Sequence, residues 1–385
     1  KDTLFAYLAD SLHVTIDSLS YDSTGCLLCG VRGVGLREQS GLRVSDLSGT
    51  VYMDSVQLSL PAWNLLTPHS QLSATVHLPW SALEPHGEAI LRTCVEGHLG
   101  HEDLQSIMHM AEADDAIQYL PTVPLQVQVE ANGNMNHLQL TECGAQLEGM
   151  LAVHTKGDLY HLLPDSTQHP VAPMSVVLDY NVGVQRIAPL LSRLGIADTP
   201  LSVPVGTTLR GGVNMVGDDY RVTSRVHALS GAIDVDANTN LTTEQYAVSM
   251  VADHFPLAAF LPTLDASALS GILMADGQKF DPTAPKALTD IKAQIDSLQL
   301  AGIDLSALTF VANIAQQHLD ACFTSNNTAI QGEGTIKGNF IDGYHLNLEA
   351  LLEHCSLQQL AGVKADVGVG SMVNISFDSD AAFET

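Results

Sequence analysis

The sequence predicts a mainly β protein, built as an elongated, curled, groove-like antiparallel β-sheet with a few short interrupting helices. Three observations predict this fold. Apolar and polar residues alternate with a period of two over most of the chain, turn-forming residues separate the alternating stretches, and helical spacing is confined to short segments. Because an alternating strand has one apolar and one polar face, a series of hairpins builds a one-faced sheet.

One short phrase, in which Asp-Ser lies between apolar residues, occurs three times: in TIDSLSY (15–21), YMDSVQL (52–58) and QIDSLQL (294–300). Each copy is either a two-residue turn or a β-bulge. The turn would pair Met53 with Val56, whereas the bulge would reset the alternation and keep the apolar side chains on one face. The sequence leaves both alternatives open for Asp17-Ser18, Asp54-Ser55 and Asp296-Ser297. An active site normally occurs once, so the repetition indicates a structural device.

Four hairpins are expected from the alternation. They join 125–131 to 138–140 through Asn132-Gly133-Asn134, 205–215 to 220–226 through 216–219, 233–237 to 246–250 through 238–240, and 329–340 to 344–350 through 341–343. In the last hairpin Gly343 takes the left-handed position, and the pairs are Phe340 with Tyr344, Gly338 with Leu346 and Ile336 with Leu348. The glycines of QGEGTIKGNF are interpreted as residues of the apolar face, because no helix with Lys-Ser/Thr follows as a phosphate loop requires.

Short helices are expected around 104–111, 187–194 and 255–262, from apolar residues at helical spacing or a Pro-bounded apolar run. They divide the chain into a β-segment with Pro- and Trp-containing connections (1–100) and three units of one helix plus hairpins (101–183, 184–252 and 253–385). We expect these to share one continuous sheet, as repeats that bury their faces against neighbours. The connections of the first segment include Pro61 to Trp63 and Pro79-Trp80.

The charge and the hydropathy of the chain argue against some classes of function. With 16 basic and 43 acidic residues the net charge is −27, which repels phosphate backbones and makes nucleic-acid binding unlikely on electrostatic grounds. No apolar run reaches the roughly 18 residues that span a bilayer, and no signal peptide opens the chain. The chain starts at Lys1 within a strand-like pattern, which predicts a segment of a longer protein.

No motif predicts an enzyme, a metal site or a cofactor. The dense group His98-Gly-Leu-Gly-His101 has the wrong order for a zinc-protease helix and is interpreted as a helix start, with Glu102 and Asp103 near the positive end of the dipole. No G-x-S-x-G is present. Of six cysteines, Cys26 and Cys29 form a lone C-x-x-C, so we interpret the cysteines as small buried apolar residues on strands. Disulfides remain an alternative in an oxidising compartment.

A one-faced sheet must cover its apolar side, either with a second sheet or by curling into a trough for an apolar ligand. The serial units, the aromatic content of 5% and the glycines of the apolar face favour the trough. Acyl chains suit such a surface, because they need apolar area and few directed hydrogen bonds. The predicted lipid-groove residues are Val127, Val129, Val213, Met215, Val222, Val226, Ile336, Phe340, Tyr344, Leu346 and Leu348.

The phrases IDSLSY, MDSVQL and IDSLQL, the hairpin QGEGTIKGNF, and the joints HFPLAAFLP and RIAPLLSRLG resemble the TamB and AsmA-like proteins of the Gram-negative envelope, especially the Bacteroides type. The resemblance extends over most of the chain. It lies in the type of repeat and includes no catalytic motif. It implies a periplasmic β-groove, anchored by an N-terminal inner-membrane helix that this chain lacks. It also implies conduction of phospholipids between the inner and outer membranes, with an outer-membrane β-barrel assembly protein as a partner. The alternatives are a structural or adhesive β-repeat with a filled core, and a carbohydrate-active β-solenoid enzyme.

Overall fold

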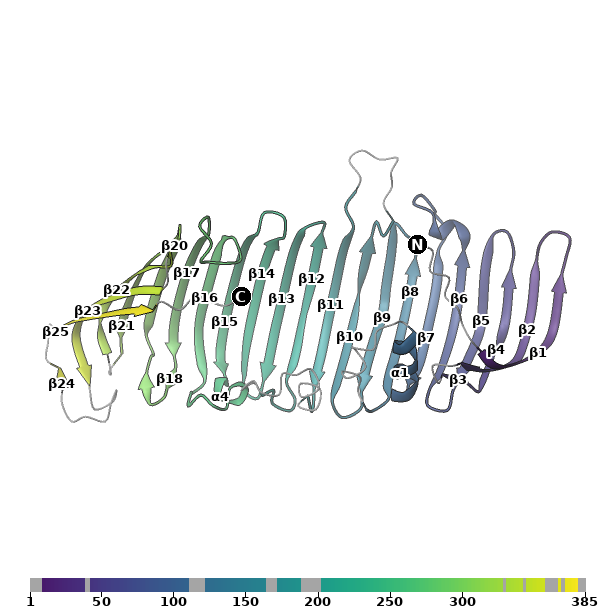
Figure 1. Ribbon diagram of the computed structural model, residues 1–385, viewed down its shortest axis with the longest axis horizontal. Coiled ribbons are helices and arrows are strands. Elements are labelled where there is room, and N and C mark those ends of the chain that lie inside the picture. Colours follow the sequence, from purple (N-terminus) through teal and green to yellow (C-terminus); the bar gives the residue numbers. More distant parts are fainter. Residues whose placement is uncertain are drawn as a thin grey trace. The chain divides into compact units, whose positions relative to one another are not determined.

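The computed structural model describes residues 9–38, 42–110, 122–163, 172–187, 202–327, 330–341, 344–356, 366–367 and 371–379. Strands make up 67% of the structure and helices 6%, which confirms the predicted mainly β class. The strands pair antiparallel into a long open sheet with few short helices (Figure 1). The chain divides into two compact units, residues 1–199 and 200–385, which we describe separately. The four predicted segments stay a prediction.

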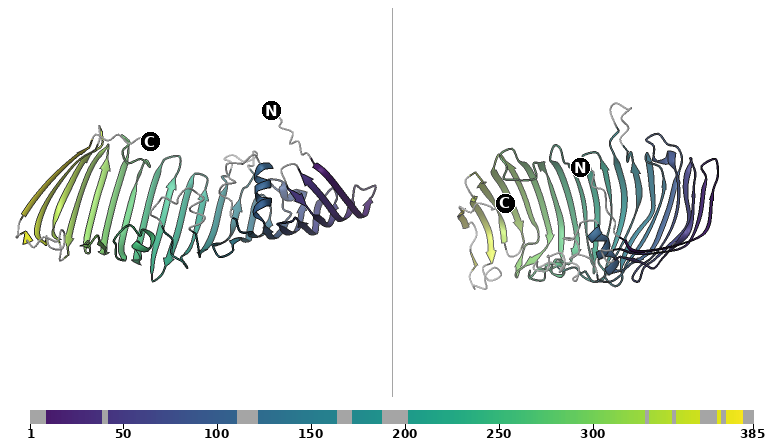
Figure 2. Two further views of the ribbon diagram at one scale, coloured as in Figure 1. Left: turned by 60° about the horizontal axis from the view of Figure 1, so that its bottom comes forward. Right: turned by 45° about the vertical axis from the view of Figure 1, so that its right-hand side comes forward.

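The N-terminal unit is a meander, in which each long strand pairs with the next one along the chain. The right-hand view of Figure 2 shows its first strands bent along their length, so this sheet is curled. Its elements are β1 (Ala9–Tyr21), β2 (Leu27–Glu38), β3 (Arg43–Val44), β4 (Asp46–Met53), β5 (Gln57–Leu66), β6 (Gln71–Pro79), the 3₁₀ helix η1 (Trp80–Leu83), β7 (Leu91–Leu99), α1 (His101–Met110), β8 (Leu125–Gly133), β9 (His137–Leu147), β10 (Leu151–Tyr160) and β11 (Ser175–Val184).

The C-terminal unit repeats the same plan, with the small β18–β19 pair inserted between β17 and β20. Its elements are β12 (Thr208–Val216), β13 (Asp219–Ala228), β14 (Gly231–Asn240), β15 (Gln245–Phe255), α4 (Leu257–Phe260), β16 (Leu269–Gln278), β17 (Leu288–Ser297), β18 (Gln299–Leu300), β19 (Ile303–Asp304), β20 (Leu308–Ala315), β21 (His318–Asn326), β22 (Ile330–Asn339), β23 (Tyr344–Ser356), β24 (Asp366–Val367) and β25 (Ser371–Ser379).

The predicted hairpin registers agree with the structure. Val213 lies opposite Val222, and Ile336 lies opposite Leu348. Three turns differ in length or position from the prediction. The β8–β9 turn follows Gly133 instead of occupying 132–134, because Asn132 and Gly133 pair with residues of β9. Because Val216 pairs with Asp219, the β12–β13 turn has two residues instead of four, and the β14–β15 turn follows Asn240 instead of occupying 238–240. Residues 342–343 lie outside the described part, so the predicted conformation of Gly343 stays a prediction.

The first and third predicted helices are present as α1 and α4, whereas the second, around 187–194, falls largely outside the described residues. The predicted connection at Pro61 to Trp63 is wrong, because these residues lie inside β5. Pro61 and Ala62 are exposed at an irregularity where β5 gains a residue over β6, a place where a strand accepts proline. Trp80 does begin a connection, η1.

The three Asp-Ser phrases take two different structures. Asp17 is the extra residue where Ile16 and Ser18 pair with the consecutive residues Val31 and Gly30, so it forms a bulge. Asp296 is likewise extra between two paired residues of β17. Asp54 instead begins the β4–β5 turn, where its Oδ1 accepts hydrogen bonds from the amides of Val56 and Gln57 at 2.7 and 2.8 Å.

Hydrogen bonds between successive turns tie the strand ends together. In the C-terminal unit four loop amides each donate to a carbonyl of the previous hairpin loop at the same end of the strands, at 2.9–3.3 Å. They belong to Leu241, Lys279, Gln316 and Phe340. In the N-terminal unit Trp80 N donates to Val56 O at 2.9 Å and Met135 N donates to Ala82 O at 3.0 Å. Each rim of turns is therefore linked through its backbone as well as through the strands.

Candidate functional site

The candidate site is the apolar face that each sheet presents. Residues that lie directly opposite one another on successive strands form rows across the sheet, because antiparallel partners share a face. In the C-terminal unit one such row crosses every long strand and contains no polar side chain. Its members are Val213, Val222, Ala237, Val248, Ala275, Ile291, Ala312, Ala321, Ile336, Leu348 and Ile375.

The N-terminal unit has an equivalent row across β4 to β11. It consists of Leu47, Leu65, Leu72, Gly97, Val127, Ala145, Val153 and Val182. The row beside it contains Trp63, Val95 and Val129. We call these surfaces the apolar face of the N-terminal unit and the apolar face of the C-terminal unit.

The apolar faces are shielded only in part. Nine of the fifteen buried apolar residues of the described structure are alanines, and no large side chain in it is fully buried. A sheet packed on a second sheet would bury its Leu, Ile and Phe side chains completely. Every predicted groove residue whose side chain is described is instead half-buried. Large apolar side chains therefore line the faces without a packed second layer over them.

The structure places the predicted residues as follows. Val127 and Val129 lie on the N-terminal apolar face, and Val213, Met215, Val222, Val226, Ile336, Leu346 and Leu348 lie on the C-terminal one. Phe340 follows the end of β22 and is half-buried. The side chain of Tyr344 lies outside the described part. The prediction missed Leu273, Ile291, Phe310 and Phe323, although their period-two spacing marks them in the sequence.

Side chains from neighbouring strands lie over the glycines of the C-terminal apolar face. A Cβ placed on Gly334 would lie 2.4 Å from Cε1 of Phe323, its partner on β21. A Cβ on Gly338 would lie 2.8 Å from Cδ2 of Leu346. Adjacent apolar side chains thus fill the space that these glycines leave open.

The opposite face is polar and carries charge pairs. Arg221 on β13 donates to both carboxylate oxygens of Asp236 on β14, at 3.2 and 2.8 Å, and holds the pKa of that carboxyl below its usual value. His137 Nε2 lies 2.6 Å from Asp158 Oδ1, and its ring stacks on Tyr160 at 4.6 Å. These exposed pairs stabilise neighbouring strands weakly.

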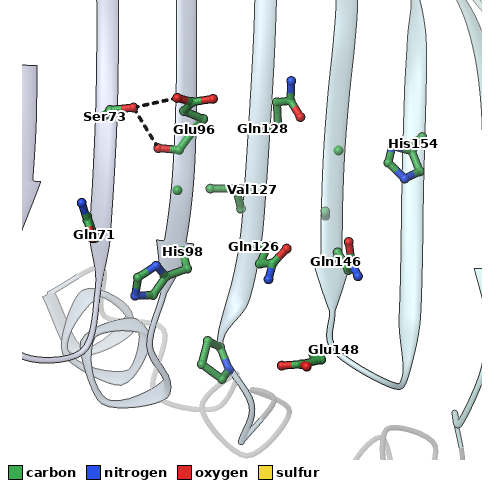
Figure 3. A pocket seen from close by; sticks show the side chains of 14 residues that line it. Gln71, Ser73, Glu96, His98, Gln126, Val127, Gln128, Gln146, Glu148 and His154 are labelled. Atoms are coloured by element: carbon green, nitrogen blue, oxygen red, sulfur yellow. Dashed lines mark hydrogen bonds between the residues drawn. The ribbon is translucent and has the colours of Figure 1, made fainter. Parts of the chain in front are cut away.

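A hollow of about 620 Å³ lies across β6 to β10 of the N-terminal unit, and much of its lining comes from the polar face (Figure 3). Four carboxamides contribute to it, from Gln71, Gln126, Gln128 and Gln146. Ser73 Oγ lies 3.4 Å from Glu96 Oε1 at its upper end.

The helix that begins after His98 packs against the sheet through an acidic residue of its first turn. Asp103 is buried and accepts hydrogen bonds from the hydroxyls of Thr67 and Ser70, in the β5–β6 turn. Glu102 pairs with His69 on the same turn. In the described ranges no group of three His, Cys, Asp or Glu side chains could hold a metal ion. The two acidic residues that follow the histidine group thus dock α1 on the β5–β6 turn.

The five cysteines with described side chains are free thiols, and none of them is fully buried. Cys29 and Cys143 lie in rows of the N-terminal apolar face. Burial and the nearby carboxylates of Glu96 and Glu130 raise the pKa of the Cys94 thiol, so it is protonated at neutral pH. The predicted burial of the cysteines is wrong, since four of these side chains are half-buried and Cys322 is exposed. Their predicted placement on strands is confirmed for all five except Cys26, which precedes β2.

The fold defines a class: open antiparallel β-sheet proteins in which each sheet unit presents an apolar face. Comparison with family models, curated proteins and solved structures finds no match. Within the described ranges, no helix has both the length and the apolar character needed to cross a bilayer.

Proposed function

We propose that the protein holds phospholipid acyl chains against its apolar faces and conducts them along the sheet, in the manner of the TamB and AsmA-like proteins that its sequence resembles. One observation supports this proposal above the others. In the uninterrupted apolar rows, the described Val, Leu and Ile side chains are half-exposed, with no packed layer over them. Soluble proteins rarely leave such a surface open unless it binds a partner or a ligand.

The proposed mechanism is passive. Burial of apolar area stabilises a bound chain by roughly 25 cal/mol per Å². Because each row continues from strand to strand with similar aliphatic residues, neighbouring positions offer similar binding free energies. A lipid can then move across the strands without a large barrier, while its headgroup stays in water.

In this proposal the protein acts in the periplasm, between the inner and outer membranes, as part of a longer chain with an inner-membrane anchor. An outer-membrane assembly protein is the proposed partner at the far end. The alternative, an adhesive or structural β-repeat with a filled core, requires fully buried large side chains. The absence of such side chains from the described residues favours the lipid-binding proposal.

The proposal is tested by purifying the protein under mild conditions and measuring bound phospholipid by mass spectrometry. Ile336→Asp places a carboxylate in the middle of the C-terminal apolar face, and we expect it to reduce bound lipid at least several-fold. Thr335→Asp is the matched control, because Thr335 is exposed on the opposite face of the same strand.

Calorimetry distinguishes an open apolar groove from a packed hydrophobic core at this face. On an open face Ile336→Asp should change the thermal transition only modestly, whereas in a packed core a buried unpaired carboxylate would unfold the unit. Lipid-free protein whose transition is unchanged by added phosphatidylcholine vesicles would rule the proposal out.

A further inference from the structure

One edge of the C-terminal apolar face carries hydroxyl groups. Tyr220 on β13 lies opposite Thr239 on β14, and Thr239 lies opposite Tyr246 on β15. The same row continues through Gly277 on β16 to Thr289 on β17. We call these four hydroxyl-bearing residues, Tyr220, Thr239, Tyr246 and Thr289, the hydroxyl row. It lies next to the turns, whereas the adjoining row of Val222, Ala237, Val248, Ala275 and Ile291 is wholly apolar.

A hydrogen bond holds two members of the row together across an intervening strand. The Tyr246 hydroxyl lies 2.7 Å from Thr289 Oγ1, and a Cβ on Gly277 would lie 2.7 Å from the same hydroxyl. The absence of a side chain at Gly277 therefore lets the phenol reach β17. The bond uses one of the two O–H protons, so the second remains to donate to a ligand oxygen.

The opposite edge of this face is apolar. Phe255 ends β15 on the same side as Ala252, is buried, and stacks on Phe260 of α4 with ring centroids 4.8 Å apart. Leu298, at the end of β17, is buried as well. Across β13 to β17 the face is therefore asymmetric, with hydroxyl groups along one edge and aromatic and aliphatic side chains along the other.

The width of the face fits a lipid tail. Thr239 and Ile233 lie on the same face of β14, six residues apart, which corresponds to about 20 Å at roughly 3.3 Å per residue. One leaflet of a bilayer has a hydrocarbon thickness of about 15 Å, half of the roughly 30 Å core. An acyl chain laid parallel to the strands therefore fits between the hydroxyl row and the apolar edge.

We infer that the C-terminal apolar face binds an amphiphile in one orientation. The ester and glycerol oxygens lie at the hydroxyl row, and the acyl chains run along the strands towards Phe255 and α4. This inference rests on the proposed lipid-binding function and adds the direction of the ligand. Tyr246 is the specificity-determining residue, because its hydroxyl meets an ester oxygen at the place where the apolar rows end. Thr289 is buried and acts as a positioning residue that holds the Tyr246 phenol.

Site-specific photocrosslinking to vesicles of palmitoyl-oleoyl phosphatidylcholine tests the orientation. Benzoylphenylalanine replaces Met215 in one protein and Leu209 in another. Both residues lie on the apolar face of β12, but Met215 is level with the hydroxyl row and Leu209 is six residues away, towards the opposite edge. Mass spectrometry of the crosslinked lipid locates the attachment point. We expect attachment near the ester from position 215 and in the methyl-terminal half of the chain from position 209.

The double variant Tyr246→Phe, Thr289→Val removes the two hydroxyls and keeps the shapes of both side chains. We expect it to abolish the difference between the two crosslinking positions while total crosslinked lipid stays within about twofold of wild type, since apolar area supplies most of the affinity. Equal attachment patterns from the two positions in wild type would overturn the orientation and leave lipid binding standing. A difference between the two positions that persists in the double variant would also overturn the orientation and leave lipid binding standing. Absence of crosslinked lipid at both positions would overturn both proposals.

Discussion

Arg32 and Asp17 are each the extra residue of a β-bulge, on two neighbouring strands, and their side chains form an ion pair. Arg32 is extra in β2 between the partners of Thr15 and Ile16, and Asp17 is extra in β1 one position further along. The two bulges offset each other, so the strands keep their pairing on both sides. Both charged side chains are exposed, while Ile16 and Leu19 stay on the same face.

Deletion of Asp17 should therefore be tolerated. Without it, Ile16, Ser18 and Leu19 alternate in the ordinary way, and the apolar residues keep their face. Deletion of Thr15 is the matched control, since it moves Ile16 to the polar face and Asp17 to the apolar one. We expect hydrogen exchange of the β1–β2 amides to stay close to wild type in the first variant and to accelerate strongly in the second. Similar acceleration in both would show that the bulge itself stabilises the hairpin.

The β4–β5 turn should contribute stability that depends on pH. Hydrogen bonds from the Tyr52 hydroxyl and from the amides of Val56 and Gln57 lower the pKa of Asp54. The unfolded chain, with an ordinary Asp pKa near 4, then binds more protons than the folded one in the acid range. The contribution is thus complete above about pH 4 and is lost as the pH falls through the folded pKa.

Asp54→Asn removes this titration. We expect its urea midpoint to lie below that of wild type at neutral pH and the two curves to converge as the pH falls below about 4. Ser55→Ala alters the same turn without changing a titrating group, so it should keep the wild-type profile. A constant difference between Asp54→Asn and wild type at every pH would contradict the assigned role.

The contact between Phe323 and Gly334 should make substitution at the glycine costly. In Gly334→Ala the new Cβ meets the Phe323 ring at 2.4 Å and the Glu349 carbonyl at 2.9 Å. Overpacking of this kind costs about 1–3 kcal/mol of unfolding free energy. Combining it with Phe323→Leu should recover part of the loss, which a double-mutant cycle by chemical unfolding measures. Strict additivity of the two changes would show that the ring does not constrain the glycine.

Docking of α1 should depend on one buried carboxylate. Asp103→Leu leaves the Ser70 hydroxyl without its acceptor, at a cost of about 1–3 kcal/mol, while the Thr67 hydroxyl keeps only the Ser70 carbonyl. Glu102→Gln loses only an exposed pair with His69 and should cost at most about 1 kcal/mol. We expect faster exchange of the α1 amides in the first variant alone. Equal protection in both would place the stability of α1 elsewhere.

Alternation in the sequence was enough to predict the β class, the registers of the hairpins and a minority of the apolar-face residues. A register follows from the sequence when a hairpin loop is short, as for Val213 and Val222. The row that joins Val222 to Ile336 could not be predicted, because it depends on the register of every strand pair between them. Pro61 misled the prediction, since an exposed bulge tolerates a residue that a regular strand would exclude.

The hydroxyl row shows where sequence reasoning stops. Tyr246 and Thr289 are 43 positions apart, and their contact requires two registers and an intervening glycine to coincide. The Asp-Ser phrases show that the same short sequence can adopt two structures. Identical letters form a bulge at Asp17 and Asp296 but a turn at Asp54, because the surrounding strand pairs decide which structure the phrase adopts.

The hydrogen bonds between successive turns have a mechanical consequence. A meander held only by its strand ladders can be peeled from an end, one strand after another, with a small force at each step. When each loop also donates to the loop before it, as Leu241 and Lys279 do, detaching a strand requires its loop to separate at the same moment. The load is then shared between neighbouring hairpins, and a unit of this construction resists unzipping under tension applied across its strands.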